Sequence, residues 1–385
     1  MKTKERKSVM ILKVLIVLLV AVMTISLASV VGCRPAVPSY EETTETAAAE
    51  TTETAVAVTP KKVTIGMIVP TLANEFWVRI SKFSQVAAEQ LGFELIVLES
   101  RDSGEVQIKN AEDLIARQVD GLIFVAYWAT GPQILGMTEK AGIPTIVMDT
   151  YVVGVRPNDT YKQFVAYMGP SNIISGYNIA TYLIDNMRVS EDGKKNMVAL
   201  LGTLGTSVAE ERAVGLEKAL GEYPDVQLLS KQTGEFRRDL GMKVMEDFLS
   251  ANSDIGAVWN ANDEMALGAI MAIKNAGRQD EIIVGGMDLN DEAVEAVIKG
   301  DYAFTLGGHW LMGGFVSTMM YDYLNGFMFT PEESWVELQL PSITNEEEAA
   351  KLKEKYLPYP SDWDFKEHSK VYNPNFESYF TELSL

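Results

Sequence analysis

The sequence predicts an α/β protein that consists of two doubly wound lobes, each with a parallel sheet. Short, continuous apolar runs alternate with amphipathic stretches, and two such series follow one another along the chain. Apolar strands separated by amphipathic helices are typical of parallel strands that are covered on both faces. A spacing of about thirty residues per strand–helix unit fits right-handed crossover connections.

The chain before the first lobe has the composition of an export signal followed by a tether. Residues 1–32 begin with five basic side chains and one acidic one, and they end in an apolar stretch. This order is typical of a secretory signal peptide. Residues 34–60 consist mostly of Thr, Glu, Ala, Pro and Val, and such a stretch is too poor in large apolar groups to form a core.

Cys33 is the only cysteine, and it directly follows a Val–Val–Gly triplet. The triplet resembles a bacterial lipobox, which implies that Cys33 is lipidated and that residues 1–32 are removed. We therefore interpret residues 33–60 as the tether of a membrane-anchored lipoprotein, at the cell surface or in the periplasm. An uncleaved membrane-spanning helix is the alternative, because the apolar stretch is nearly long enough to cross a bilayer. Both interpretations place the folded part outside the cytoplasm.

Charge and composition exclude several classes of function. The formal charge is −20, and removing five basic and one acidic side chain with residues 1–32 would make it −24. Binding to nucleic acid or to an anionic membrane surface is therefore not expected. A lipidated Cys33 leaves no thiol for a disulfide or a nucleophile. The chain has only His309 and His368 as histidines, so we predict no cofactor and no zinc or iron site; a calcium ion stays open.

The first lobe begins at residue 61. We predict strands at 63–69, 93–98, 121–126 and 143–148, and helices at 76–92, 106–118 and 132–141. Asn74, Phe76 and Trp77 follow the first strand, and Asp149 follows the fourth. Because the carboxyl ends of parallel strands share one edge of the sheet, these side chains should lie together.

The second lobe repeats this pattern. We predict strands at 197–201, 226–230, 255–260 and 282–287. We predict helices at 209–220 and 240–251, and a third helix that follows the strand 255–260 and ends at residue 277. Polar and aromatic side chains again follow the strands, namely Arg212, Phe236, Asn262, Asp288 and, after a later apolar run, His309.

The stretch 257–268 marks a transition from strand to helix. Residues 257–260 continue an apolar run, and the residues after them carry apolar side chains at helical spacing up to Gly277. Asn262 and two carboxylates lie between, where a helix N-terminus needs acceptors for its free N–H groups. One acceptor suffices for capping, so we predict that Asn262 contacts a ligand; pure capping is the alternative.

The residues at the strand ends provide carboxylate, amide, guanidinium and aromatic groups. This set suits a small neutral molecule with many hydroxyl groups, because a hydroxyl both donates and accepts hydrogen bonds and sugar C–H faces pack on aromatic rings. The Gly-rich pieces 202–205 and 307–308 lack the spacing of phosphate-binding loops. We interpret them as tight turns or points of close backbone approach.

Several of these runs resemble the ribose-binding branch of the periplasmic sugar-binding proteins, whose core also occurs in LacI-type repressors. The run 262–268, Asn–Asp–Glu–Met–Ala–Leu–Gly, is the most similar part, and the resemblance extends over about residues 61–337. No helix-turn-helix precedes the first strand, so a repressor function is excluded. The resemblance implies the type I periplasmic binding protein fold, with two lobes joined by a three-segment hinge, and it implies no enzymatic activity.

The resemblance also implies ligand-binding roles for nine residues, which are Asn74, Phe76, Trp77, Asp149, Arg212, Phe236, Asn262, Asp288 and His309. Two positions depart from the ribose binders. Thr150 stands where they usually have an Arg after the acidic residue, and His309 stands where they usually have a Gln. These departures, with the additional Trp77 and Trp259, favour a polyol or a sugar other than ribose.

The hinge crossings implied by the resemblance fall near residues 169–170, 307–309 and 338–341. The N-terminal lobe would then comprise 61–168 plus 309–338, and the C-terminal lobe 169–308 plus 339–344. Proteins of this family close on their ligand and deliver it to a membrane permease. We accordingly expect a monomeric receptor for a sugar ABC importer.

Two other functions stay open. A sensory receptor of the same fold would present its sugar to a chemoreceptor or histidine kinase. A secreted glycosidase would need two carboxylates on either side of one bond, and Glu75, Asp149, Glu210 and Asp288 are the candidates. The extension 345–385 lies beyond the resemblance and combines a charged helix with a stretch rich in aromatic residues. We predict that it packs as a strap over one lobe.

Overall fold

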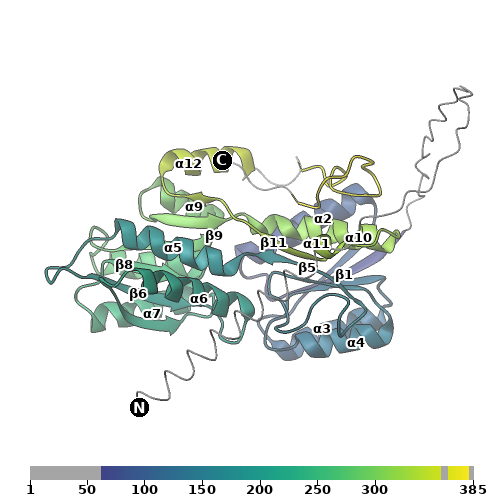
Figure 1. The fold of residues 1–385 in the computed structure, drawn as a ribbon, viewed down its shortest axis with the longest axis horizontal. Helices are drawn as coiled ribbons and strands as arrows, with labels where there is room; N and C mark the ends of the chain where they lie inside the picture. The colour runs from purple at the N-terminus through teal and green to yellow at the C-terminus, as the bar shows by residue number, and fades with distance from the viewer. Residues whose placement is uncertain (1–61, 357–362, 381–385) are drawn as a thin grey trace, which may run out of the picture. The chain divides into compact units, whose positions relative to one another are not determined.

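The computed structural model describes residues 62–356 and 363–380. The predictions for residues 1–32, for Cys33 and for the tether lie outside these ranges. The described chain forms two six-stranded sheets flanked by helices (Figure 1), which confirms the predicted two-lobe α/β fold. Within the same ranges, we find no helix that is long and apolar enough to span a bilayer.

The sheet of the first lobe is entirely parallel and has the strand order β11-β5-β4-β3-β1-β2. Its strands are β1 (Thr64–Val69), β2 (Glu94–Glu99), β3 (Gly121–Phe124), β4 (Thr145–Met148), β5 (Phe164–Pro170) and β11 (Trp335–Leu338). Helices α2 (Glu75–Leu91) and α10 (Met312–Leu324) pack together on one face, and α3 (Gly104–Ala116) and α4 (Gly131–Ala141) cover the other. The short helix α11 (Pro331–Ser334) leads into β11.

The sheet of the second lobe has the order β12-β10-β9-β8-β6-β7, and only β12 runs antiparallel to its neighbour. Its strands are β6 (Lys195–Leu201), β7 (Val226–Thr233), β8 (Ala257–Asn260), β9 (Ile283–Asp288), β10 (Phe304–Gly307) and β12 (Ser342–Ile343). Its helices are α5 (Asn172–Asn186), α6 (Ser207–Glu222), α7 (Arg238–Ala251), α8 (Asp263–Asn275) and α9 (Asp291–Ile298).

The chain passes from one sheet to the other at three places. β5 belongs to the first sheet, and α5 after it packs on β8, β9 and β10 of the second. β10 belongs to the second sheet and is followed by the 3-10 helix His309–Leu311 and then by α10 on the first. β11 in the first sheet is followed by β12 in the second.

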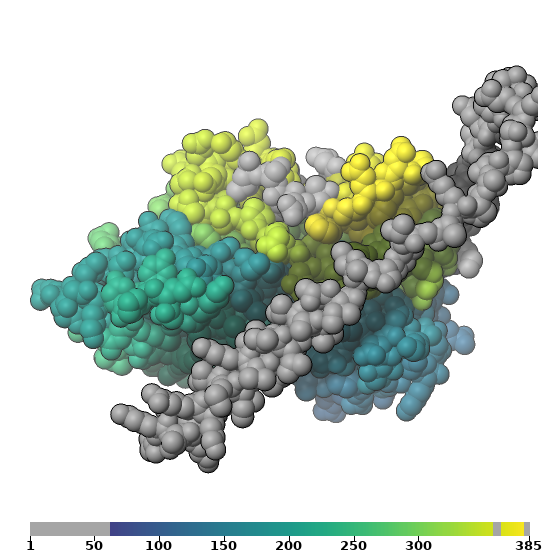
Figure 2. Space-filling model, viewed as in Figure 1, coloured from purple at the N-terminus to yellow at the C-terminus, as the bar shows by residue number. Residues whose placement is uncertain are grey.

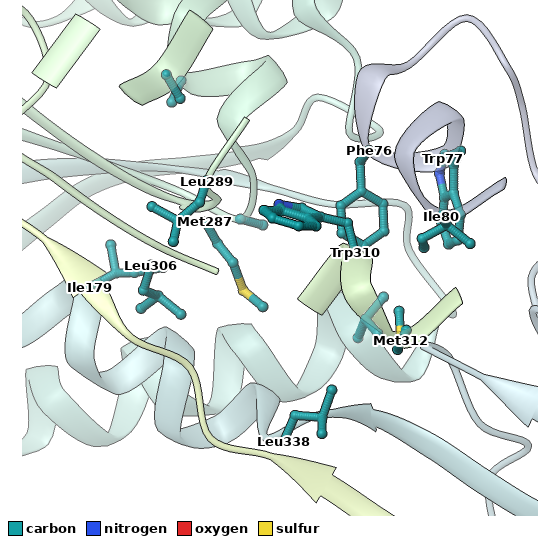
Figure 3. Close-up of a cluster of buried hydrophobic side chains, with 14 of the residues drawn as sticks. Phe76, Trp77, Ile80, Ile179, Met287, Leu289, Leu306, Trp310, Met312 and Leu338 are labelled. Atoms are coloured by element: carbon teal, nitrogen blue, oxygen red, sulfur yellow. The ribbon is translucent and has the colours of Figure 1, made fainter. Parts of the chain in front are cut away.

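Trp310 joins the hydrophobic cores of the two lobes. Its side chain is completely buried and its ring stacks on Phe83 of α2 with 5.3 Å between the ring centroids. Figure 3 shows Trp310 next to Phe76, with Met287 and Leu289 of the second lobe on its other side. The second crossing is therefore fixed in place by apolar packing against both lobes.

Helix α10 shows why this part of the first lobe was not predicted from the sequence. Eleven consecutive residues of α10 are buried, from Met312 to Asp322. A helix that is covered on all sides has no polar face and so lacks the amphipathic pattern that identifies helices in a sequence. Gly121 makes room for this packing, since a Cβ there would lie 2.4 Å from the sulfur of Met320.

The C-terminal extension contacts both lobes, so the prediction that it covers one lobe is wrong. Helix α12 (Glu346–Tyr356) packs on α9 of the second lobe. The segment 363–380, the yellow surface in Figure 2, packs on α2 and α10 of the first lobe, where Phe365 is fully buried against Phe83 and Phe315. Phe365 and Tyr379 of the extension therefore form part of the core.

Candidate functional site

The carboxyl ends of the strands of both lobes surround one small cavity. It is lined by all nine predicted ligand-binding residues and by one further residue, Tyr127. Its volume is about 30 Å³, which is room for one or two water molecules. A sugar ring therefore fits only when the surrounding groups move apart.

The aromatic wall of the cavity comes from the start of α2. Asn74 caps this helix, because its Oδ1 accepts a hydrogen bond of 2.8 Å from the backbone N–H of Phe76. Phe76 and Trp77 follow directly, and their rings meet edge to face with centroids 4.9 Å apart. The cap thus fixes the first turn of α2, and this first turn directs both rings toward the cavity.

Asp149 and Asp288 stand at equivalent places in the two lobes. Each directly follows a Met at the end of a strand, and each has a positive φ, 62° for Asp149 and 139° for Asp288. A glycine packs against the backbone of each: a Cβ on Gly169 would lie 2.6 Å from the carbonyl oxygen of Asp149, and one on Gly307 would lie 2.2 Å from the carbonyl carbon of Asp288. Positive φ is unusual outside glycine and concentrates at functional sites.

Arg212 is the buried cation of the site. Its Nε donates to Oδ1 of Asn172 at 2.9 Å, and a terminal nitrogen donates to the carbonyl oxygen of Ala261 at 2.6 Å. Burial raises the pKa of the Asp149 carboxyl, and Arg212 opposes that rise. Burial also raises the pKa of Asp288, with a further contribution from the nearby Asp263, and Arg212 again opposes it.

His309 lies between the two carboxylates. Its Nε2 is 4.0 Å from Oδ1 of Asp149 and 3.8 Å from Oδ1 of Asp288. Burial lowers the pKa of His309 well below its usual value, and Arg212 lowers it further, so the imidazole is neutral at pH 7. Both ring nitrogens are buried and have no hydrogen-bond partner within the described chain. A neutral imidazole in this position can donate one hydrogen bond to a ligand and accept another.

Asn262 both caps a helix and lines the cavity. Its Oδ1 accepts a hydrogen bond from the N–H of Met265 at 3.0 Å, and its Nδ2 donates to the carbonyl oxygen of Phe236 at 3.3 Å. Its side chain thereby fixes the Phe236 loop as well as the start of α8. Gly202 lets the ring of Phe236 approach, since a Cβ there would lie 2.0 Å from that ring.

Tyr127 was missed in the sequence, although it lies just after a predicted strand. Its ring packs against two other aromatic rings of the cavity. Its ring centroid lies 6.1 Å from that of Trp77 and 6.5 Å from that of Phe236 of the other lobe. Its hydroxyl is hydrogen-bonded with Thr150, which also donates to Oδ2 of Asp149 at 2.8 Å. The signal that could have found it is the aromatic pair 127–128 at the carboxyl end of β3.

Other candidates lie elsewhere. Trp259 does not reach the cavity, because it is fully buried in the second lobe and donates its indole N–H to the carbonyl oxygen of Gly176 at 3.0 Å. Glu75 binds Arg79 instead, and Glu210 is exposed on α6. Of the four carboxylates considered for a glycosidase, only Asp149 and Asp288 line the cavity. Among the described residues, no group of His, Cys, Asp and Glu is arranged to hold a metal ion.

This arrangement matches the hydrogen-bonding needs of a polyhydroxylated molecule. Two carboxyl groups from different lobes accept hydrogen bonds, Arg212 donates them, and His309 can do both. Because Arg212 is charged, the hydrogen bonds that it donates are shorter and stronger than those of a neutral donor. The rings of Phe76, Trp77 and Phe236 supply apolar faces of the kind on which sugar rings pack.

The chain belongs to the periplasmic binding proteins, since the family model described as a periplasmic binding protein domain matches residues 65–326. It is 32% identical to the ribose import binding protein of Escherichia coli over 249 residues, which cover 64% of this chain and 79% of that protein. It is likewise 32% identical to the galactofuranose-binding protein of the same organism over 221 residues, which cover 56% of this chain and 67% of that one. The chain is thus of the ribose type.

Solved structures support the same classification. A galactofuranose binding protein superposes with a TM-score of 0.70 at 26% identity, over 77% of this chain and 99% of that one. An ABC transporter solute binding protein from Bacillus halodurans with bound myo-inositol gives a TM-score of 0.66 at 26% identity, over 79% and 100%. Both similarities cover the two lobes of the fold.

Proposed function

We propose that this protein is an extracytoplasmic receptor that captures a neutral sugar or polyol between its lobes and delivers it to the permease of an ABC importer. The single observation that carries the proposal is the position of His309. It is a buried, neutral imidazole with two unpartnered nitrogens, between one carboxyl group from each lobe. Such groups cost free energy unless a ligand satisfies them.

Ligand binding then stabilises the closed arrangement, because the ligand contacts both lobes at once. Asp149, Phe76 and Trp77 come from the first lobe, and Arg212 and Asp288 from the second. A ligand shifts a conformational equilibrium only by its difference in affinity for the two states. A molecule that bridges Asp149 and Asp288 has that difference, and the closed form is the one that a permease would recognise.

The N-terminal predictions complete the proposal. A lipidated Cys33 and the tether 33–60 would hold the receptor at the outer side of the membrane. The permease is the proposed partner, and we propose that a monomer suffices. We propose no catalysis, since the carboxylates act as hydroxyl acceptors; hydrolysis of a glycoside that is lost in Asp149→Asn would contradict this.

A thermal-shift screen of the purified protein against pentoses, hexoses, polyols and nucleosides tests the proposal. A ligand at one hundred times its Kd should add about 2.7 kcal/mol to the free energy of unfolding. For any hit, Arg212→Ala should lower the affinity by about 2–5 kcal/mol, because it leaves buried charges unpaired.

The exposed Arg117, on α3 away from the cavity, serves as the matched control, and Arg117→Ala should bind like the wild type. A blank screen, or an Arg212→Ala variant that binds normally, would contradict the assigned site.

A further inference from the structure

A groove much larger than the sugar cavity opens directly beside it. The groove has a volume of about 920 Å³, against about 30 Å³ for the cavity. The two share part of their walls, namely Asn74, Trp77, Tyr127 and Phe236. Whatever occupies the cavity is therefore within reach of the groove, at the edge where the two lobes face each other.

Three loops with an unusual backbone form the groove. In the described chain, eleven residues other than glycine have a positive φ. Six of them occur as consecutive pairs in the loops after β2, β3 and β7: Arg101 with Asp102, Trp128 with Ala129, and Glu235 with Phe236. All of these except Ala129 line the groove. Such conformations cost free energy and persist where the surrounding structure imposes them, typically at binding sites.

Aromatic rings lead from the cavity into the groove without a break. Tyr127 lines both spaces, and its ring meets Trp128 edge to face at 5.4 Å. Trp128 is half-buried and lies on the groove side only. Gly104 at the start of α3 leaves room for it, since a Cβ there would lie 2.9 Å from the Cβ of Trp128. The ring of Trp128 is thus held in place, yet accessible.

The charges of the groove favour a neutral occupant. Three arginines and four carboxylates line it, and two of the arginines are already paired. Arg237 binds Asp239 with two hydrogen bonds of 3.1 and 2.7 Å, and Arg238 binds Glu264 at 2.9 Å. Asp102 accepts a hydrogen bond from Thr71 and faces Arg237. The third arginine, Arg101, lies 4.0 Å from Glu99, so a phosphate would find no arginine without an acidic neighbour, whereas hydroxyl groups would find both donors and acceptors.

We propose that this groove is a second saccharide subsite, so that the ligand is a disaccharide with one ring in the cavity and the other stacked on Trp128. The inference rests on the proposed sugar-binding function and extends it. Asp102, Thr71 and Glu235 supply hydrogen bonds to the second ring, and Trp128 supplies an apolar face. Solved relatives contain single-ring ligands, namely myo-inositol and D-allose, and a second ring is the feature that this proposal adds.

Isothermal titration calorimetry of the full-length protein tests the inference. The probes are D-glucose, D-galactose, D-ribose and L-arabinose, and the disaccharides maltose, cellobiose, lactose and melibiose. One disaccharide should bind at least tenfold more tightly than either of its component sugars. Trp128→Ala should weaken that disaccharide about tenfold and leave any monosaccharide affinity unchanged, whereas Trp77→Ala should weaken both.

Trp363→Ala is the matched control, since Trp363 is another half-buried tryptophan outside both spaces, and it should change neither affinity. Monosaccharides that bind as tightly as the disaccharides, or a Trp128→Ala effect that is equal for both, would overturn the subsite while the sugar-binding function stands. If no saccharide of either size binds, the subsite is overturned, and the proposed function fails as well if the polyols of the thermal-shift screen do not bind either. If Trp128→Ala does not fold, the affinities of the wild type for disaccharides and monosaccharides still test the subsite.

Discussion

Asp149 and Asp288 occupy a strained backbone conformation that the glycines opposite them permit. Each positive φ outside glycine costs on the order of 1–3 kcal/mol. The strain is maintained because Gly169 and Gly307 allow the neighbouring strand to pack directly on the backbone of the two acidic residues, and because the hydroxyl of Tyr167 donates to the carbonyl oxygen of Asp149 at 2.8 Å. The carboxyl groups are thus preorganised before a ligand arrives.

We predict that Gly307→Ala weakens ligand binding and lowers the free energy of unfolding by about 1–3 kcal/mol, the usual cost of overpacking. Its Cβ would collide with the backbone of Asp288, which must then shift. Titration calorimetry and urea unfolding measure the two effects.

Gly221 in α6 is the matched control, because nothing lies within 4 Å of a Cβ at that position. Gly221→Ala should stabilise the protein by about 0.5–1 kcal/mol and leave binding unchanged. If Gly307→Ala and Gly221→Ala have the same ligand affinity and the same free energy of unfolding, Gly307 does not position Asp288.

The residues of the site could be predicted to the extent that they follow a strand. Asn74, Asp149 and Asp288 lie at or just after the end of a strand, and Arg212 lies in the second turn of the helix after β6, so the alternation of strands and helices predicted all four at the same edge of the sheets. Trp259 lies within a strand, and the face on which its ring lies depends on packing that no local pattern reveals.

At the scale of the elements, the extension after β12 is integrated into both lobes. Asp322 at the buried end of α10 is its main polar anchor, accepting hydrogen bonds from the Ser369 hydroxyl at 2.6 Å and from the Lys370 N–H at 2.5 Å. Burial raises the pKa of Asp322 to about 6, although these hydrogen bonds act in the opposite direction. The folded state therefore holds the proton of Asp322 more tightly than the unfolded state does.

This linkage predicts a pH-dependent stability difference. Because the folded pKa lies above the unfolded value of 3.8, the contribution of Asp322 is fully present below pH 4 and is lost as the pH rises through about 6. Relative to Asp322→Asn, the wild type should lose up to about 3 kcal/mol of unfolding free energy between pH 4 and pH 7. Urea unfolding at several pH values measures it.

Asp239 provides a control whose pKa shift has the opposite sign, since its hydrogen bond with Arg237 lowers the pKa of its carboxyl. Asp239→Asn should not reproduce the trend. If the curves for the wild type and Asp322→Asn stay parallel from pH 4 to pH 7, Asp322 is not the titrating group.

Several elements were missed in the sequence, and those next to the crossings share a physical cause. The strands and helices that alternate in the first part of each lobe have one clear pattern each, and they were found within a few residues of their true ends. The elements β5, α5, β10 and α10 stand next to the crossings between the two sheets, and α10 is buried on every side. Tertiary packing, which a local pattern does not contain, decides their structure.

On the scale of the whole molecule, the closed arrangement has direct contacts between the lobes besides the cavity. Arg79 of α2 is buried and forms ion pairs with Glu75 of its own helix and with Asp291 of α9 in the second lobe. The N–H of Asp291 donates to Glu75 Oε1 at 3.1 Å. These contacts stabilise the closed state whether or not a ligand is bound.

We therefore predict that Asp291→Asn shifts the unliganded protein toward an open form. Small-angle X-ray scattering should give a larger radius of gyration than for the wild type without ligand, and the same radius with ligand. The apparent affinity should fall a few-fold, because closing the lobes on the ligand then costs more free energy. Glu217→Gln, which removes an ion pair with Lys231 within one lobe, is the control. An unchanged radius in Asp291→Asn would contradict the role of this contact.

The strand order places β2, β7, β11 and β12 at the four open edges of the two sheets. Open edges tend to pair with those of other molecules, and charged side chains or very short strands prevent this. Here β2 begins and ends with a glutamate, β7 carries Lys231, β11 carries Glu337, and β12 is only two residues long. Copies of this protein at high concentration should therefore stay separate and resist aggregation.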